Sequence, residues 1–224
     1  MCGRYVLASE LKAIAKRFGV EAAELALSSR YNVAPSQEMP VVLHKEINQI
    51  QLMRWGLIPF FAKEAKIGYS MINARSETVV EKPSFRKPIK SQRCIVPANG
   101  FYEWKKSNTE KVPYFIHLKN SPLFGFAGLY DQWKDPTGKD ILSYTILTTE
   151  ANDLLRPLHE RMPVILTPEE EEAWLDTEKY PVNDVVGFLK PYPADQMEAY
   201  TVSKNVNSPR TDSPDLINRV ETEN

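Results

Sequence analysis

The second residue of the chain, Cys2, is the side chain with the most distinctive chemistry. A cysteine directly after the initiator Met1 is small enough for the methionine to be removed, which would leave a free α-amine beside the thiol. The amine titrates near ~7.7–8.0 and the thiol near ~8.5, so both are partly reactive at neutral pH. The amine can condense with an aldehyde to a Schiff base, and the thiolate can then close onto the imine carbon as a thiazolidine. Alternatively, the amine serves as the base for its own thiol, or Cys2 is an ordinary residue of a frayed terminus.

Two later side chains are suited to carrying protons beside such a nucleophile. Glu103 stands between two aromatic residues directly after an Asn-Gly turn, and apolar neighbours favour the neutral form of a carboxyl group by desolvation. The alternative is an edge-strand glutamate that faces water. His159 lies just before Met162-Pro163, where an imidazole can project into a cleft and transfer protons at neutral pH. His44 and His117 lie in alternating strand patterns and are interpreted as structural.

A basic stretch near exposed-looking aromatic residues is the candidate nucleic-acid surface. The segment Asn73–Thr78 mixes amide, cation and carboxylate, and Arg75 is its most site-like member. Further cations follow along the chain: Lys82, Arg86, Lys87, Lys90 and Arg93. Such cations can line a groove for a phosphate backbone, and Phe60 and Phe61 can stack on bases. A solvated charged face and an apolar loop that covers the core are the alternatives.

The composition limits these interpretations. With 28 Lys and Arg against 29 Asp and Glu, the net charge of −1 predicts no bulk attraction to polyanions, so a nucleic-acid site must be a local patch. The two cysteines, Cys2 and Cys94, provide neither a disulfide framework nor a zinc motif, and no two histidines have metal-ligand spacing. We therefore expect no metal, no cofactor and a location in the reducing cytoplasm. No apolar run approaches membrane-spanning length and no signal-peptide segment is present, so we expect no membrane association.

The hydrophobic pattern predicts many short strands and a few helices, in keeping with 17 prolines against 9 glycines. Strands are expected at residues 41–44, 50–55, 94–96, 112–118, 123–129, 143–149 and 199–203. An amphipathic helix is expected between the N-cap Ser9 and Gly19. A capping box at Thr167 opens another helix, and shorter helices are expected from Glu150 and after Asn183.

The chain of 224 residues fits a single domain. We see no internal repeat and no interdomain linker. We place the domain at residues 1–208 and interpret residues 209–224 as a polar, flexible tail.

The segments singled out above occur together, and in this order, in one known family. The matching motifs are Cys2–Tyr5, Arg30–Pro35, Trp55–Pro59, Asn73–Thr78, Ala98–Trp104, His159–Pro163 and Val202-Ser203 with Val206-Asn207. The chain thereby resembles the SRAP (SOS response-associated peptidase) proteins, which process abasic sites in DNA. The overall pattern is similar to the bacterial single-domain form, and seven ordered motifs are far more specific than any one of them.

The resemblance implies an α+β domain with a curved, barrel-like antiparallel β core and flanking short helices. It further implies single-stranded DNA with abasic sites as the partner and a covalent link between the N-terminal cysteine and the ring-opened aldehyde. In these terms Cys2 is the nucleophile, Asn73 positions the amine and the sugar, and Glu103 and His159 are the acid–base residues. Flanking phosphates would be held by Arg4 and Arg75. Cross-link reversal, weak lyase activity and autoproteolytic removal of Met1 belong to the same implied repertoire, with a role in the SOS response.

Two other classes of protein remain open from the sequence. One is a glutamine amidotransferase of the N-terminal-nucleophile type, which also begins Cys-Gly but needs oxyanion-hole loops; residues Phe101–Trp104 do not fit it. The other is a non-catalytic single-strand binder that uses Phe60, Phe61 and the basic run. We expect a monomer that acts on nucleoid DNA in the cytoplasm.

Overall fold

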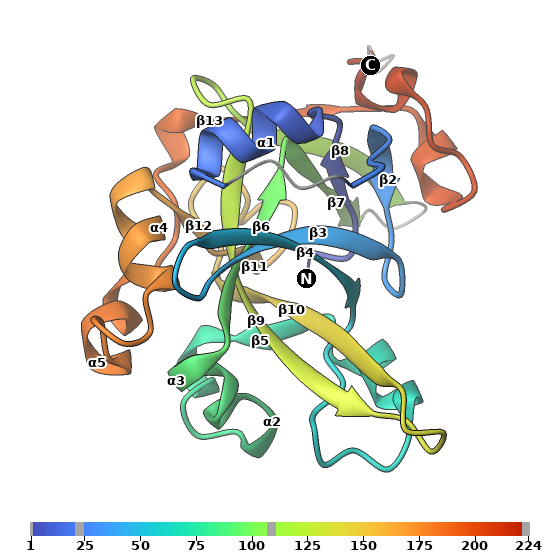
Figure 1. Cartoon of the computed structure of the whole chain (residues 1–224). Coiled ribbons are helices and arrows are strands. Elements are labelled where there is room, and N and C mark those ends of the chain that lie inside the picture. The colour runs from blue at the N-terminus through green and yellow to red at the C-terminus, as the bar shows by residue number, and fades with distance from the viewer. Residues whose placement is uncertain (1, 21–24, 107–110, 221–224) are drawn as a thin grey trace.

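Five strands of the chain close into a barrel. The computed structural model describes residues 2–20, 25–106 and 111–220. The ring consists of β3 (Glu38–His44), β4 (Asn48–Trp55), β10 (Asp140–Glu150), β9 (Phe124–Lys134) and β6 (Arg93–Ala98). Each strand pairs with the next and β6 returns to β3, antiparallel except between β10 and β4 (Figure 1). Because the ring closes, each of these five strands has a paired neighbour on both sides.

A second sheet lies against the barrel, and its strand β7 (Gly100–Lys106) follows the barrel strand β6 directly in the chain. Its order is β13 (Met197–Thr201), β8 (Lys111–Leu118), β7, β1 (Tyr5–Leu7) and β2 (Arg30–Val33), all antiparallel. Three short strands extend the barrel: β5 (Asn73–Arg75) and β11 (Arg161–Pro163) pair with β10, and β12 (Ile165–Leu166) pairs with β9. The predicted α+β fold with a barrel-like β core is confirmed.

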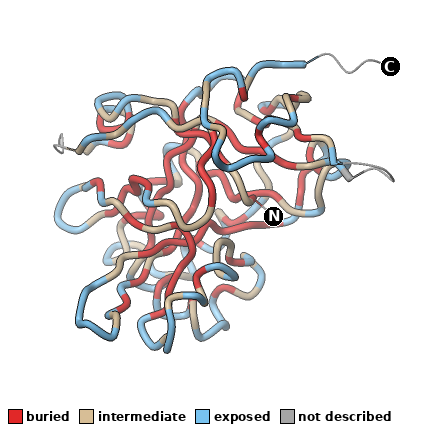
Figure 2. The backbone as a smooth tube through the Cα atoms, turned by 90° about the vertical axis from the view of Figure 1, so that its right-hand side faces the viewer, coloured by how far each residue is buried: buried red, intermediate tan, exposed pale blue. Residues whose placement is uncertain are grey.

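The core is a continuous apolar interior that runs through the barrel, drawn as the red stretches of the tube in Figure 2. Tyr5 of the second sheet reaches into it, because its hydroxyl shares a buried 2.8 Å hydrogen bond with the hydroxyl of Tyr144 on β10. Trp55 stacks on Tyr144 with ring centroids 6.4 Å apart. Tyr5 also meets the Trp55 ring edge to face at 5.2 Å, so Tyr5 attaches the strand that follows Cys2 to the barrel.

Helices are short and lie outside the barrel (Figure 1). The α-helices are α1 (Leu11–Phe18), α2 (Pro83–Arg86), α3 (Pro88–Ser91), α4 (Pro168–Leu175) and α5 (Val182–Val185). The 3-10 turns are η1 (Ala65–Ser70), η2 (Ser76–Thr78), η3 (Val186–Phe188), η4 (Ala194–Gln196), η5 (Lys204–Asn207) and η6 (Pro214–Ile217). No described helix is long and apolar enough to cross a membrane.

Local capping signals predicted some helix ends correctly and others wrongly. Gly19 ends α1 in the left-handed conformation, with φ of 61°, and Thr167 forms the predicted capping box. Glu10 rather than Ser9 is the N-cap of α1, because Ser9 bonds with the Asn99 side chain instead. No helix starts at Glu150: β10 ends there and turns follow.

The remaining corrections concern the C-terminal part of the chain. Asn183 lies inside α5, whose N-cap is Pro181, and β13 begins at Met197, two residues before the predicted strand. Residues 209–220, which belong to the segment interpreted as a tail, contact the second sheet. Leu216 is fully buried in a cluster with Val6 and Tyr102, and Asp212 accepts hydrogen bonds from the Arg30 side chain and from the main-chain nitrogen of Tyr31. Residues 221–224, the end of the predicted tail, lie outside the described residues.

Candidate functional site

Cys2 lies in the apolar core just before β1. Its side chain has no solvent exposure, and its Sγ lies 3.9 Å from the carbonyl oxygen of Arg4. Burial raises the pKa of the Cys2 thiol to about 12, and the nearby charge of Glu103 adds to the shift. A thiol in these surroundings stays protonated at neutral pH, so any attack by its sulfur requires a base that takes the proton.

Asn73 holds the main chain of Cys2 in place. Its Nδ2 donates a 2.8 Å hydrogen bond to the carbonyl oxygen of Cys2, which joins β5 to the N-terminal segment across 71 positions of sequence. The Oδ1 of Asn73 is buried and has no hydrogen-bond partner within the described part of the chain. Because a buried acceptor without a donor is costly, this oxygen is ready to accept a hydrogen from a bound molecule.

Glu103 is a buried carboxylate on a central strand. β7 lies between β8 and β1, and Glu103 is 3% exposed opposite Tyr114. The alternative of an edge-strand glutamate facing water is therefore wrong. Its effect on the Cys2 thiol shows that the two groups are close enough to interact electrostatically. A carboxylate that acts electrostatically on a buried thiol is a candidate to exchange a proton with it.

His159 is oriented by its neighbour Arg161. The main-chain nitrogen of Arg161 donates a 3.0 Å hydrogen bond to Nδ1 of His159, so the proton of the neutral ring lies on Nε2. The Arg161 side chain is fixed in turn by a bidentate pair with Glu77, at 2.8 and 3.0 Å, and by the carbonyl of Thr148 at 2.6 Å. Arg161 and Glu77 belong to two of the quoted motifs, but no local pattern indicated that they pair.

Strand β10 brings the two halves of this group together. β5, which carries Asn73, and β11, which follows His159, both pair with β10, and Thr148 is the register partner of both Arg75 and Pro163. We use the name Cys2 pocket for Cys2, Asn73 and Glu103, which the contacts above connect, together with His159 and Arg161, which β10 links to the strand of Asn73 through Thr148. The sequence analysis had predicted the first four of these residues.

Arg4 is partly engaged in holding the fold. Its Nη1 donates to Asn32 Oδ1 at 2.7 Å and to the carbonyl of Val206 at 2.9 Å, and its guanidinium lies 5.9 Å from the centre of the Trp104 ring. Partial burial lowers its pKa. Arg75, in contrast, is exposed at the end of β5.

The predicted DNA-contacting residues around α2 form an aromatic–basic surface. Phe60 and Phe61 are 52% and 51% exposed and meet edge to face at 5.2 Å. Lys87 Nζ lies 4.6 Å from the centre of the Phe60 ring. We define this surface by Phe60, Phe61, Lys82, Arg86 and Lys87, all of them exposed.

Arg93 does not belong to this surface, although it continues the basic run. It is 2% exposed and donates to the carbonyl oxygens of Trp174, Tyr180 and Asp176 at 2.6, 2.7 and 3.1 Å. Burial lowers its pKa to about 10. A cation that binds carbonyls at the C-terminal end of a helix is stabilised by the helix dipole, so the role of Arg93 is structural.

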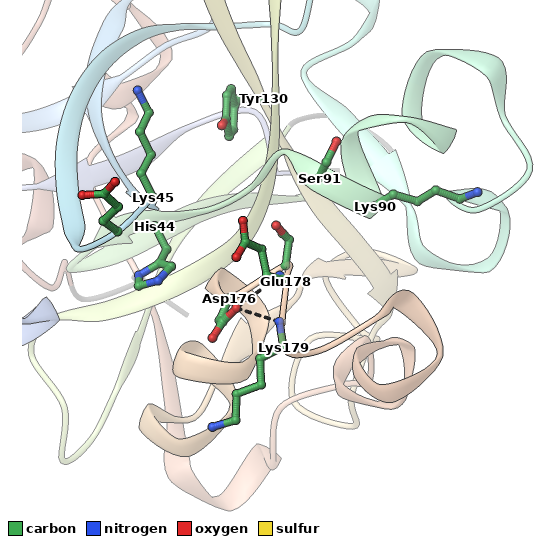
Figure 3. A pocket seen from close by; sticks show the side chains of 10 residues that line it. His44, Lys45, Lys90, Ser91, Tyr130, Asp176, Glu178 and Lys179 are labelled. Atoms are coloured by element: carbon green, nitrogen blue, oxygen red, sulfur yellow. Dashed lines mark hydrogen bonds between the residues drawn. The ribbon is translucent and has the colours of Figure 1, made fainter.

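A large hollow of about 1220 Å³ lies elsewhere, between the β3–β4 turn, α3 and the loop after α4. Figure 3 shows its lysines and carboxylates interspersed, with Asp176 bonded to the main chain of its own loop. The predicted cation Lys90 is part of its wall, whereas the residues predicted around Cys2 are not. A smaller cavity of about 440 Å³ is lined in part by Glu77, the ion-pair partner of Arg161. The described residues contain no cluster of His, Cys, Asp or Glu that could hold a metal ion.

Comparison with known proteins identifies the family. A model described as SOS response associated peptidase (SRAP) matches residues 1–209. The abasic site processing protein YoqW of Bacillus subtilis is 49% identical over 221 residues, which cover 97% of this chain and 99% of the relative. The abasic site processing protein HMCES of Gallus gallus is 34% identical over 224 residues, covering 85% of this chain and 66% of the relative. A crystal structure of a protein from Bacteroides thetaiotaomicron has a TM-score of 0.91 and 33% identity, covering 98% of this chain and 100% of the other. This chain belongs to the SRAP family.

Proposed function

We propose that this protein captures abasic sites in single-stranded DNA through a covalent bond to Cys2. Removal of Met1 frees the α-amine, and the ring-opened aldehyde of the lesion is the electrophile. The observation that carries the proposal is the fully buried Cys2, tied through its carbonyl to Asn73 and electrostatically coupled to Glu103. The relatives named as abasic site processing proteins support the choice of substrate.

The proposed reaction has three stages that each move a proton. An abasic sugar is mostly a closed hemiacetal, so a general acid first helps to open it. The α-amine then adds to the aldehyde carbon, and loss of one water leaves the imine. Finally the Cys2 sulfur adds to the imine carbon while a proton reaches the nitrogen, which closes the thiazolidine. The net change is the loss of one water.

We assign the two proton carriers from their surroundings. Glu103 takes the proton of the Cys2 thiol, which would otherwise stay bound because the pKa of that thiol is raised. His159 donates from Nε2, because its Nδ1 already accepts the Arg161 main-chain hydrogen. Reversal of the cross-link requires the same two groups to return these protons. Asn73 orients the amine through the adjacent carbonyl, and its buried Oδ1 accepts a hydrogen from the amine or the sugar.

Two groups of residues are proposed to hold the DNA. Arg75 and Arg4 contact the phosphates that flank the lesion, with Arg4 kept in position by Asn32. The aromatic–basic surface grips the strand farther away through base stacking and charge. Such a local patch allows a protein of net charge −1 to bind DNA.

A pair of Cys2 variants tests the covalent step. Cys2→Ala should form no denaturation-resistant adduct with abasic single-stranded DNA, while its Kd for that DNA stays within about twofold, since Cys2 makes no phosphate contact. Cys2→Ala and Cys2→Ser both keep the α-amine after Met1 removal, so both should form only an imine, which becomes permanent when borohydride reduces it. An equal yield of stable adduct from Cys2→Ala would refute the assignment. Binding that ignores the abasic site, with no adduct from the trimmed wild type, would favour the non-catalytic binder.

A further inference from the structure

The loop that carries Phe60 and Phe61 is fastened to the barrel by side chains of β9 and β10. The main-chain nitrogen of Ile58 donates to Ser143 Oγ at 2.7 Å, and that of Phe60 donates to Asp131 Oδ2 at 2.9 Å. At the end of the loop, Trp133 Nε1 donates to the carbonyl of Ala62 at 2.7 Å. The two exposed rings therefore stand on a main chain that is held at three points.

These three holding residues are close neighbours on the two strands. Asp131 and Ser143 are direct register partners, and Trp133 lies two residues beyond Asp131 along β9. Residues two apart on a strand point to the same face, as do direct cross-strand partners. All three are buried, Ser143 completely and Asp131 to 1% exposure. We call Asp131, Trp133 and Ser143 the bracket; they lie on one face of the β9–β10 pair.

Burial of Asp131 at this position is energetically unfavourable. It receives hydrogens from Phe60 N at one oxygen, and from Gln132 N at 2.9 Å and Gln92 Nε2 at 3.3 Å at the other. Among the described residues no salt bridge joins it to a cation. A buried carboxylate without a cation costs more than a neutral group of the same shape, and its hydrogen bonds offset only part of that cost. Beyond its own strand pair, Asp131 binds the Gln92 side chain and the main chain of the loop that presents Phe60.

We propose that Asp131 is a positioning residue that holds the Phe60–Phe61 pair ready to stack on nucleobases. The proposal rests on the proposed function, since the bases belong to the captured strand. A ring fixed before binding loses less conformational freedom when a base stacks on it, so a rigid loop binds more tightly than a mobile one. Lys87, which lies against the Phe60 ring, adds its charge at the same place.

The first experiment measures, in the absence of DNA, how firmly the bracket holds the main chain at Phe60. In Asp131→Asn, the single remaining oxygen is expected to face the two donors Gln132 N and Gln92 Nε2, which turns the new NH₂ group toward Phe60 N. Hydrogen exchange of the Phe60 amide should then speed up by at least about tenfold. Asp140→Asn, on the same strand pair and exposed beside Lys134, is the matched control and should leave that amide unchanged. Unaltered exchange at Phe60 in Asp131→Asn would overturn the proposal.

The second experiment measures how the substitution at Asp131 changes the Kd for intact single-stranded DNA. Asp131→Asn should raise the Kd about fivefold, near the low end for the loss of one stacked base. In a Phe60→Ala/Phe61→Ala background the same substitution should add nothing, because the rings it positions are gone. An equal penalty in both backgrounds would show that Asp131 acts elsewhere and would overturn the proposal.

Two further measurements separate the possible failures. If Asp131→Asn does not fold, Ser143→Ala tests the bracket through the exchange of the Ile58 amide, where the same tenfold increase is expected and no increase refutes it. Capture of free 2-deoxyribose by trimmed Cys2 should be equal in Asp131→Asn and wild type; a loss there as large as the loss in DNA affinity would refute a positioning role. Wild type that captures neither 2-deoxyribose nor abasic DNA would overturn the proposed function, while the amide exchange still decides whether Asp131 holds the loop.

Discussion

The Cys2 pocket and the aromatic–basic surface differ in how far their side chains are exposed to water. In the pocket, Cys2 and Glu103 are buried and Asn73 and His159 half-buried, and loss of water is the main cause of the raised thiol pKa. On the surface, Phe60 and Phe61 are about half exposed and their neighbours are solvated cations. Desolvation controls proton transfer, whereas exposed rings and charges control affinity. Variants of the pocket should therefore change the rate of capture at saturating DNA, and variants of the surface should change Kd.

The largest effect is expected from Glu103→Gln. Loss of the carboxylate should slow adduct formation by about 10²–10⁴-fold, the usual contribution of an acid–base group, with Kd within about twofold. The same change removes a negative charge beside Cys2, so the pKa of that thiol should fall below about 12. Thiolate absorbance during a pH titration, in a Cys94→Ala background, measures this shift. An unchanged thiol pKa would separate Glu103 from Cys2.

The opposite behaviour is expected from Phe60→Ala/Phe61→Ala. Loss of base stacking should raise the Kd for single-stranded DNA roughly 5- to 100-fold, while the capture rate at saturation stays the same. Lys87→Ala should have a smaller effect on Kd and reduce the slope of log K against log salt by about one. A fall in the saturating rate of the double variant would mean that the two regions are not independent.

Asn73→Ala tests whether the pocket needs a fixed main chain at Cys2. Without the 2.8 Å hydrogen bond to the Cys2 carbonyl, adduct formation should slow by about tenfold, in line with the loss of one hydrogen bond. Asn205→Ala, an exposed amide on η5, serves as the matched control. Equal rates for both variants would remove Asn73 from the site.

The smallest effect should come from the support of His159. Glu77→Gln weakens the bidentate contact to Arg161 and should slow capture about two- to fivefold at neutral pH, a size typical of an exposed ion pair. Arg161 lowers the pKa of Glu77, so the ion pair is complete above the ordinary value of about 4.3 and is lost as pH falls through the lowered pKa.

This ion pair also predicts a pH dependence. The Glu77→Gln rate should lack the part of the acid decline that comes from Glu77, whereas Glu81→Gln, also exposed, should retain it. Rates measured at low and neutral pH decide between them. An identical acid decline in wild type and Glu77→Gln would assign it to another carboxyl group.

Local signals made part of this structure predictable from sequence. Gly19 and the capping box at Thr167 act within one turn of their own helices, so their positions could be foreseen. The ordered motifs around Cys2, Asn73, Glu103 and His159 indicated the family, and the fold was predicted from that family resemblance. The site roles of these four residues remain predictions that the experiments above test.

Other features depend on contacts between distant segments. Barrel closure requires β10 to pair in parallel with β4, almost ninety residues earlier, and no local pattern encodes that pairing. Arg93 was read as an exposed cation because its acceptors come from residues 174–180. No local sequence pattern indicates the role of Asp131, because the Phe60 nitrogen that it binds lies 71 positions away.

The central claim is tested most directly by the intact mass of the protein before and after incubation with single-stranded DNA that contains one abasic site. The account predicts a starting mass that lacks Met1, followed by an increase equal to the oligonucleotide minus one water that survives denaturation. A protein with trimmed Met1 and no adduct would contradict it.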